Sequence, residues 1–157
     1  FNELVDFHIA SDAEISVAVQ PVSYEDVSGF GILKQDEYNR ITSFVEKPQD
    51  DAALAGFESG SDPGKPYLAS MGIYVFNADF LYELLGHEGD DFGHDLIPGA
   101  IAQDRGVSGY IYDGYWEDIG TIRRFYDVNL DMARPDAPFD FYDAERPIYT
   151  HARFLPG

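Results

Sequence analysis

The chain has 157 residues, of which 45% are apolar, so it has the size and composition of one globular domain with a buried core. Its formal net charge of -19 repels the phosphates of nucleic acids and the headgroups of anionic lipids. It has no cysteine, which excludes disulfides, thiolate metal sites and thiol nucleophiles. No apolar run is long enough to cross a bilayer, and no signal-peptide pattern opens the chain. We therefore expect a cytoplasmic protein that has neither nucleic acid nor membrane as a partner.

The two ends of the sequence indicate a piece of a longer polypeptide. The chain starts at Phe1 rather than Met, and residues 1–10 have the pattern of the end of a helix. It stops at Leu155-Pro156-Gly157, after an extended stretch from residue 139 that contains Pro147. We expect residues 1–138 to be part of one catalytic domain and residues 139–157 to be an extended linker to an absent domain.

Hydrophobic periodicity and turn residues divide the chain into alternating strands and helices. Asn39 lies between two short strands and predicts a hairpin, because Asn adopts positive φ at little cost. Such a hairpin predicts an α/β domain with a mixed sheet, which we expect to be mainly parallel. In chain order the expected elements are a helix end at 1–10, a strand at 14–22, a polar loop at 24–29, strands at 30–34 and 40–45, a short helix at 51–56, a strand at 67–76, helices at 79–85 and 95–103, a strand at 107–112 and a helix at 122–133.

The stretch from Tyr115 to Thr121 joins the last expected strand to the longest expected helix. It contains the only tryptophan, Trp116, followed by Glu117, Asp118 and Gly120. Open α/β sheets keep their ligand sites where strands end, and a carboxylate there can hold Mg²⁺ together with substrate phosphates. The simpler interpretation is that Asp118 accepts hydrogen bonds from backbone amides at the start of the helix.

Two further positions are candidates for ligand binding. Lys47 follows a strand and precedes Pro48, so we expect extended geometry at Lys47, with its ammonium available to a phosphate. The alternative is a solvated lysine that pairs with Glu46 or Asp50. Ser70 and Gly72 interrupt an apolar strand, where Gly either admits a ligand or adjusts the packing of the sheet. Asp91 is expected to cap the helix that follows it.

Five motifs in this order resemble those of the sugar-nucleotide pyrophosphorylases, and most closely those of the ADP-glucose pyrophosphorylases (glucose-1-phosphate adenylyltransferases). The motifs are Phe30-Gly31-Ile32-Leu33-Lys34, Phe44-Val45-Glu46-Lys47-Pro48, Ala69-Ser70-Met71-Gly72-Ile73-Tyr74-Val75-Phe76, Asp91-Phe92-Gly93 with Ile97-Pro98, and Asp113-Gly114-Tyr115-Trp116-Glu117-Asp118-Ile119-Gly120-Thr121. The resemblance implies the Rossmann-like fold of the nucleotide-diphospho-sugar transferases, incomplete on its N-terminal side.

The resemblance also implies the reaction and the roles of single residues. The family joins ATP and glucose 1-phosphate into ADP-glucose and pyrophosphate for glycogen or starch synthesis, with Mg²⁺ as cofactor. It implies that Lys47 binds the sugar phosphate, that Glu46 and Ser70 hold sugar hydroxyls, and that Gly72 leaves room for the hexose. Asp118 becomes a catalytic metal ligand, and Trp116 shapes its turn.

Departures from the family pattern limit what this chain does alone. The glycine-rich nucleotide loop, a second metal-binding aspartate and the C-terminal β-helix of an allosteric homotetramer are not in the sequence. We therefore expect an inactive piece that supplies the sugar-phosphate site. The alternatives are a UDP- or dTDP-sugar pyrophosphorylase, a non-catalytic regulatory subunit or sugar-phosphate binding module of the same fold, and an acidic α/β domain without a ligand.

Overall fold

The structure is a computed structural model that describes residues 1–86, 89, 91–141 and 143–145. The chain divides into two compact units, Phe1–Asp113 and Gly114–Gly157, and each is described here by itself. In the described part of the chain, no helix has the length and apolar character needed to span a membrane.

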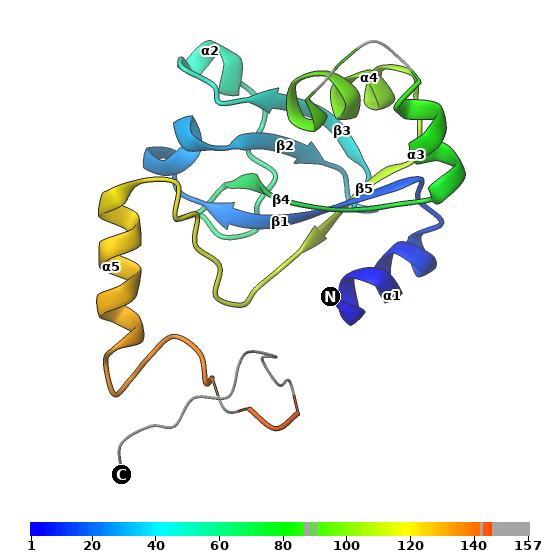
Figure 1. The fold of residues 1–157 in the computed structure, drawn as a ribbon. Coiled ribbons are helices and arrows are strands. Elements are labelled where there is room, and N and C mark those ends of the chain that lie inside the picture. Colours follow the sequence, from blue (N-terminus) through cyan, green and yellow to red (C-terminus); the bar gives the residue numbers. More distant parts are fainter. Residues whose placement is uncertain (87–88, 90, 142, 146–157) are drawn as a thin grey trace. The chain divides into compact units, whose positions relative to one another are not determined.

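The described residues of the first unit form a five-stranded sheet with the order β3-β2-β4-β1-β5 (Figure 1). Only β1 and β5 run parallel, whereas the β1–β4, β2–β3 and β2–β4 pairs are antiparallel. The expectation of a mainly parallel sheet was therefore wrong, because β4 runs back between β1 and β2 and pairs antiparallel with both. The strands are β1 (Ile15–Val22), β2 (Gly31–Gln35), β3 (Ile41–Glu46), β4 (Tyr67–Phe76) and β5 (Val107–Ile111).

The predicted hairpin between β2 and β3 is confirmed, and its turn has the expected chemistry. Asn39 has a φ of 64°, and the Asp36 carboxylate accepts from the amides of Tyr38 and Arg40 at 2.9 Å. The same turn reaches the outer edge of β5, where the amide of Gly109 donates to the Asn39 carbonyl at 2.8 Å. The hairpin tip thus covers part of an edge strand that would otherwise expose unpaired backbone groups.

Short helices cover the two faces of the sheet. On one face lie α3 (Ala78–Leu84), the π-helical turn η2 (Phe92–Leu96) and α4 (Ile97–Ala102), as Figure 1 shows for the two α-helices. Pro98 lies in the first turn of α4, as its missing amide requires. The buried cluster of this face consists of Ile15, Val17, Val19, Leu33, Ile41, Leu68, Phe80, Leu84, Leu96, Ile97, Ala100 and Val107.

The opposite face has a smaller cluster beneath η1 (Tyr24–Gly29) and α2 (Asp51–Leu54). Its buried residues are Val22, Val27, Ile32, Leu54, Tyr67 and Ala69. The sequence predicted a polar loop where η1 forms a 3₁₀ helix, since a single buried residue, Val27, leaves no periodic pattern to read. The Asp50 carboxylate caps α2 by accepting from the amide of Ala53 at 2.9 Å.

The N-terminal helix α1 (Asn2–Ser11) docks on the sheet through a buried histidine. The Nδ1 atom of His8 lies 2.8 Å from the hydroxyl of Ser16, which is fully buried in β1. The other ring nitrogen lies 3.3 Å from the Asn77 side-chain oxygen, and Asn77 also donates to the Ala13 carbonyl. Asn77 occupies the cap position of α3, but its side chain serves this network and not the helix amides.

The second unit is built around α5 (Ile122–Met132). The Thr121 hydroxyl accepts from the amide of Arg124 at 3.2 Å and thereby caps the helix. The ring of Phe139 lies 5.9 Å from that of Tyr115 and brings the chain back towards the start of the unit. No residue of α5 is buried, and the apolar side chains of Ile122, Phe125 and Leu130 are exposed. The extended segment expected at 139–157 lies mostly outside the described residues.

Candidate active site

A row of neighbouring residues on β3, β2 and β4 forms the base of the candidate site. Glu46 pairs with Gly31 across β3 and β2, and the β2–β4 register brings Gly31 next to Ser70. Directly paired residues point to the same side of a sheet. This side carries the larger buried cluster, and the row lies where the parallel strands β1 and β5 approach their carboxyl ends. Ligands of open α/β sheets bind at such strand ends.

The carboxylate of Glu46 links this row to Lys47. Its Oε1 atom lies 3.3 Å from the Lys47 ammonium, which is the pairing that the simpler interpretation of Lys47 anticipated. The Lys47 side chain is 61% exposed, whereas that of Glu46 is 29% exposed. An ion pair this exposed contributes only about 0–1 kcal/mol, so an incoming phosphate can compete for the ammonium.

The backbone of Lys47 differs from the expectation. β3 ends at Glu46, one residue beyond the predicted strand, and Lys47 has a φ of 42°, in the left-handed region rather than the expected extended conformation. Pro48 disfavours the right-handed helical region at Lys47 and favours extended backbone, so the positive φ observed here departs from this rule. The Lys47 amide donates to the Phe30 carbonyl at 3.0 Å, and its own carbonyl accepts from the Gln49 side chain at 2.7 Å. These two bonds hold the turn in place, and Pro48 behind it is buried.

This conformation is unusual for a lysine. Among the described residues, the other non-glycine residues with positive φ are Asp12, Asn39 and Asp104. Aspartate and asparagine tolerate the left-handed region through local hydrogen bonds, whereas lysine has no such compensation. Strain of this kind is retained where the surrounding structure demands it, and it occurs often at functional sites.

Ser70 and Gly72 lie at an irregularity of β4. The register with β1 shifts between Val17 and Val19, which pair with Tyr74 and Ser70, so β4 bulges at residues 71–73. Gly72 takes a φ of 70° within this bulge, and its amide donates to the Ser70 hydroxyl at 3.3 Å. The space around a Cβ at Gly72 is empty to 4 Å. Gly72 therefore forms the bulge of β4, and it also leaves open space at its side-chain position. These observations are compatible with both interpretations, an adjustment of the sheet and room for a ligand.

Tyr74 and Asp91 complete this site, and the sequence had not assigned them to it. The Tyr74 hydroxyl lies 3.4 Å from that of Ser70, and its ring stacks on Phe92 at 5.8 Å. Burial raises the pKa of Tyr74, with the charges of Glu46 and Asp91 adding to the effect. The four-residue spacing of Tyr74 from Ser70 on one strand was a signal that could have located it.

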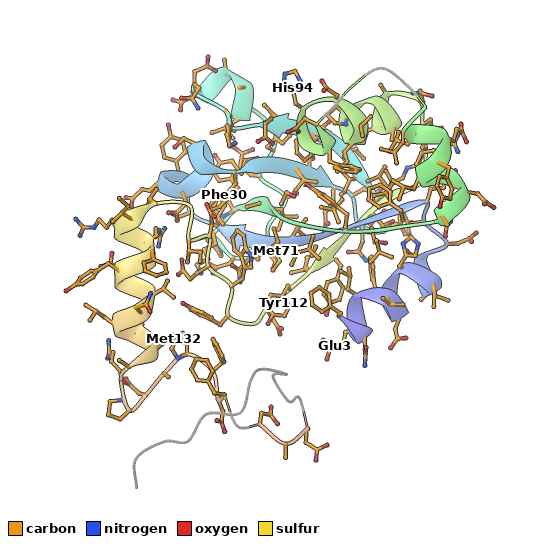
Figure 2. The ribbon with its side chains drawn as sticks, viewed as in Figure 1. Glu3, Phe30, Met71, His94, Tyr112 and Met132 are labelled. Carbon is orange, nitrogen blue, oxygen red and sulfur yellow. The ribbon has the colours of Figure 1, made fainter. Side chains whose placement is uncertain are left out.

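Asp91 has the helix-capping role that its sequence context predicted. Its Oδ1 atom accepts from the amides of Gly93 and His94, at 2.8 and 2.7 Å. His94 is exposed, and Figure 2 shows its ring projecting outward from η2. The Asp95 carboxylate accepts a hydrogen bond from the His94 ring and raises the pKa of His94. The cap thus fixes the first turn of η2 beside the candidate site.

Trp116 and Asp118 lie in the second unit, so their geometry is described apart from that of Lys47. Asp118 is exposed, and its Oδ1 atom accepts from the amide of Gly120 at 3.2 Å. The simpler interpretation, a carboxylate that orders the turn before a helix, is therefore realised. Trp116 is half-buried, and the neighbouring Glu117 carboxylate lies 3.3 Å from the Arg124 guanidinium.

The chemistry of Asp118 also fits a magnesium ion. Mg²⁺ in phosphate-transfer sites is held by one or two carboxylates together with the phosphates of the substrate. An exposed aspartate that uses one oxygen for a backbone amide meets this requirement. Within the described residues, no three acidic or histidine side chains gather into a metal site by themselves.

Comparison with known proteins identifies the family. The profile of the nucleotidyl transferase family, described as "Nucleotidyl transferase", matches residues 1–134. The small subunit of glucose-1-phosphate adenylyltransferase, chloroplastic/amyloplastic, from Triticum aestivum is 40% identical over 168 residues, which cover 99% of this chain. This chain spans 36% of the length of that curated relative. The family match and this identity agree with the order of motifs read from the sequence, and the chain belongs to the nucleotidyl transferase family.

Proposed function

We propose that this chain is the sugar-phosphate part of a glucose-1-phosphate adenylyltransferase, which makes ADP-glucose and pyrophosphate from ATP and glucose 1-phosphate. The exposed Lys47 ammonium beside the half-buried Glu46 carboxylate carries the proposal, because it places a cation for a phosphate next to an acceptor for a hydroxyl. The identity to the wheat protein over 99% of the chain supports this choice of substrates.

In this proposal each residue has a defined task in bringing two anions together. Lys47 binds the phosphate of glucose 1-phosphate and offsets its charge, which the strongly acidic surface of the chain otherwise repels. Glu46 accepts from one sugar hydroxyl, and the Ser70 hydroxyl bonds to another. The open space beside Gly72 admits the hexose.

The reaction is a displacement at phosphorus that depends on position and charge. An oxygen of the sugar phosphate attacks the α-phosphorus of ATP in line, the new P–O bond forms, and the bond to the leaving pyrophosphate breaks. Asp118 would hold Mg²⁺, with Trp116 shaping the turn that carries it. When bound, Mg²⁺ supplies neutralisation of the negative charge on the reacting phosphates. Lys47 keeps the attacking phosphate in position throughout this step.

The remaining parts of the enzyme are assigned to sequence outside this chain. We infer that residues 1–138 are the C-terminal half of a catalytic domain and that residues 139–157 lead to a β-helix domain. The greater length of the wheat relative supports this inference. For the whole protein we propose the following: it recognises ATP through residues outside this chain, it responds to allosteric effectors, it forms a homotetramer, and it is cytoplasmic.

The decisive experiment uses the full-length protein that carries this sequence. It is offered glucose 1-phosphate and Mg²⁺ with ATP, UTP, dTTP or CTP in turn, and pyrophosphate release is measured. We expect release with ATP alone. Preference for another nucleotide would assign a different sugar-nucleotide pyrophosphorylase, and no release from a folded protein would indicate a regulatory subunit. Either of these results would overturn the proposal.

A further inference from the structure

Two buried glycines face the carboxylate of Glu46 from different elements. A Cβ atom placed on Gly31 in β2 would lie 2.7 Å from Oε2 of Glu46. A Cβ atom placed on Gly93 in η2 would lie 2.9 Å from the same oxygen. The carboxylate therefore occupies space that any other residue at either position would take.

The backbone at these positions does not itself demand glycine. Neither Gly31 nor Gly93 has a φ in the left-handed region, which contrasts with Gly72 at 70°. Glycine within a strand or a helix is less favourable than alanine, because it loses more conformational freedom on folding. The structural reason for glycine at both positions is therefore the side chain that lies against them, namely Glu46, together with the ring of Phe44 over Gly31.

We propose that Gly31 and Gly93 are positioning residues that set the place of the Glu46 carboxylate beside Lys47. The Oε2 atom of Glu46 packs against both glycines, and its Oε1 atom lies 3.3 Å from the Lys47 ammonium. The glycines thus fix the spacing between the acceptor for the sugar hydroxyl and the cation for the phosphate. This inference rests on the function proposed above, and it adds to that function the residues that determine the fit of the hexose phosphate.

The substitution Gly93→Ala adds one methyl group beside the Glu46 carboxylate and tests this proposal. Moving Oε2 from 2.9 Å to an ordinary contact of 3.4 Å requires a shift of about 0.5 Å, which is the tolerance within which binding groups must be held. The other neighbour, Oδ1 of Asp91, already lies at 3.4 Å. The displaced atom is the end of a flexible side chain, so the fold can absorb the change while the site cannot. Gly31→Ala is less suitable, because its Cβ would lie 2.5 Å from the Phe44 ring.

The experiment measures the Kd of the full 157-residue chain for glucose 1-phosphate by titration in ¹H–¹⁵N NMR spectra. The variants are Gly93→Ala, Glu46→Ala and the double variant. Gly99→Ala is the matched control, because Gly99 also lies in a helix of this layer and its Cβ would meet nothing within 4 Å. The spectra report in parallel whether each variant is folded.

We expect Gly93→Ala to weaken binding about tenfold, the scale of one impaired hydrogen bond to a charged group. The double variant should bind no more weakly than Glu46→Ala alone, because Gly93 acts through that carboxylate. Gly99→Ala should bind as the wild type does. A merely structural role for Gly93 would instead give losses that add to those of Glu46→Ala.

Three results would overturn the inference, and they differ from one another. Wild-type affinity of Gly93→Ala, with weakened binding by Glu46→Ala, would remove the glycine from the site and leave the proposed function intact. Failure of Gly93→Ala to fold would show that the contact with Glu46 is not what requires glycine. Wild-type affinity of Glu46→Ala would remove Glu46 itself, and with it this part of the proposed function.

Discussion

Replacing Lys47 by glycine should leave the chain more stable than replacing it by alanine, and both changes should weaken sugar-phosphate binding. Lys47 has a φ of 42°, and the left-handed conformation costs a residue with a Cβ roughly 1–2 kcal/mol. Glycine avoids this cost but loses roughly 0.5–1 kcal/mol through the greater freedom of the unfolded chain. The ion pair with Glu46 is exposed and contributes about 0–1 kcal/mol.

Lys47→Ala is the matched control, because it removes the same ion pair and retains the Cβ atom. The difference between the glycine and alanine variants therefore isolates the backbone strain. We expect the glycine variant to be more stable than the alanine variant by about 0.5–1 kcal/mol in free energy of unfolding. That difference corresponds to a rise in Tm of roughly 1–4 °C for a chain of this size.

Urea denaturation followed by far-UV circular dichroism measures both variants and the wild type. Equal m values would show that the variants unfold from the same compact state. A glycine variant that is no more stable than the alanine variant would refute the reasoning, since it would mean that the backbone at Lys47 carries no strain. Both variants should lose affinity for glucose 1-phosphate to a similar extent, so the difference in stability between them should not be accompanied by a difference in binding.

Three further predictions concern other parts of the chain. Ser16→Ala should lower the free energy of unfolding by about 1–3 kcal/mol in urea denaturation, because it leaves the Nδ1 atom of the buried His8 ring without its hydrogen-bond partner; an unchanged value would show that this hydrogen bond does not hold α1. The Arg105 guanidinium holds the pKa of Glu14 below its ordinary value of 4.5, so the stability that this pair contributes is present above pH 4.5 and is lost as pH falls through the lowered pKa. Arg105→Ala should therefore reduce the acid sensitivity of Tm in that range, and an identical pH profile would contradict the assignment. Asp118→Asn in the full-length protein should lower kcat and alter the Mg²⁺ dependence of pyrophosphate release, whereas unaltered kinetics would exclude Asp118 as a metal ligand.

Local signals in the sequence predicted the elements well. The asparagine of the β2–β3 turn, the carboxylate before η2 and the threonine before α5 act through neighbours two to four residues away, so short-range chemistry determines them. Strand β4 has the bounds predicted for it, Tyr67–Phe76, because its apolar run ends in turn residues on both sides.

The relative directions of the strands in the sheet could not be predicted from local signals. Whether β4 pairs with β1 depends on contacts between residues far apart in the sequence, such as Val22 with Tyr67 or Ile15 with Phe76. No local pattern records such a pairing, and strands alternating with helices favoured a parallel sheet. The antiparallel insertion of β4 was for that reason missed.

The candidate site was predicted only in part. Glu46 and Lys47 are adjacent in the sequence. Ser70 lies near Glu46 only because Gly31 on β2 stands between them, and this arrangement arises when β3, β2 and β4 pair. Residues from η2 enter the same site by a further long-range contact, which places Gly93 against the Glu46 carboxylate. The conformation of Lys47 also depends on the Phe30 carbonyl across the hairpin, so the rule for residues before proline was insufficient.

The most direct test of the account is the affinity of this chain for glucose 1-phosphate, with Lys47→Ala compared against Lys65→Ala. Lys65 is an exposed lysine in the loop before β4, so its replacement removes the same charge from another place. We predict that the wild type and Lys65→Ala bind glucose 1-phosphate alike, that Lys47→Ala binds at least about tenfold more weakly, and that glucose without phosphate does not distinguish Lys47→Ala from the wild type. Equal loss of affinity in the two lysine variants, or none in either, would contradict the assignment of a sugar-phosphate site to Lys47.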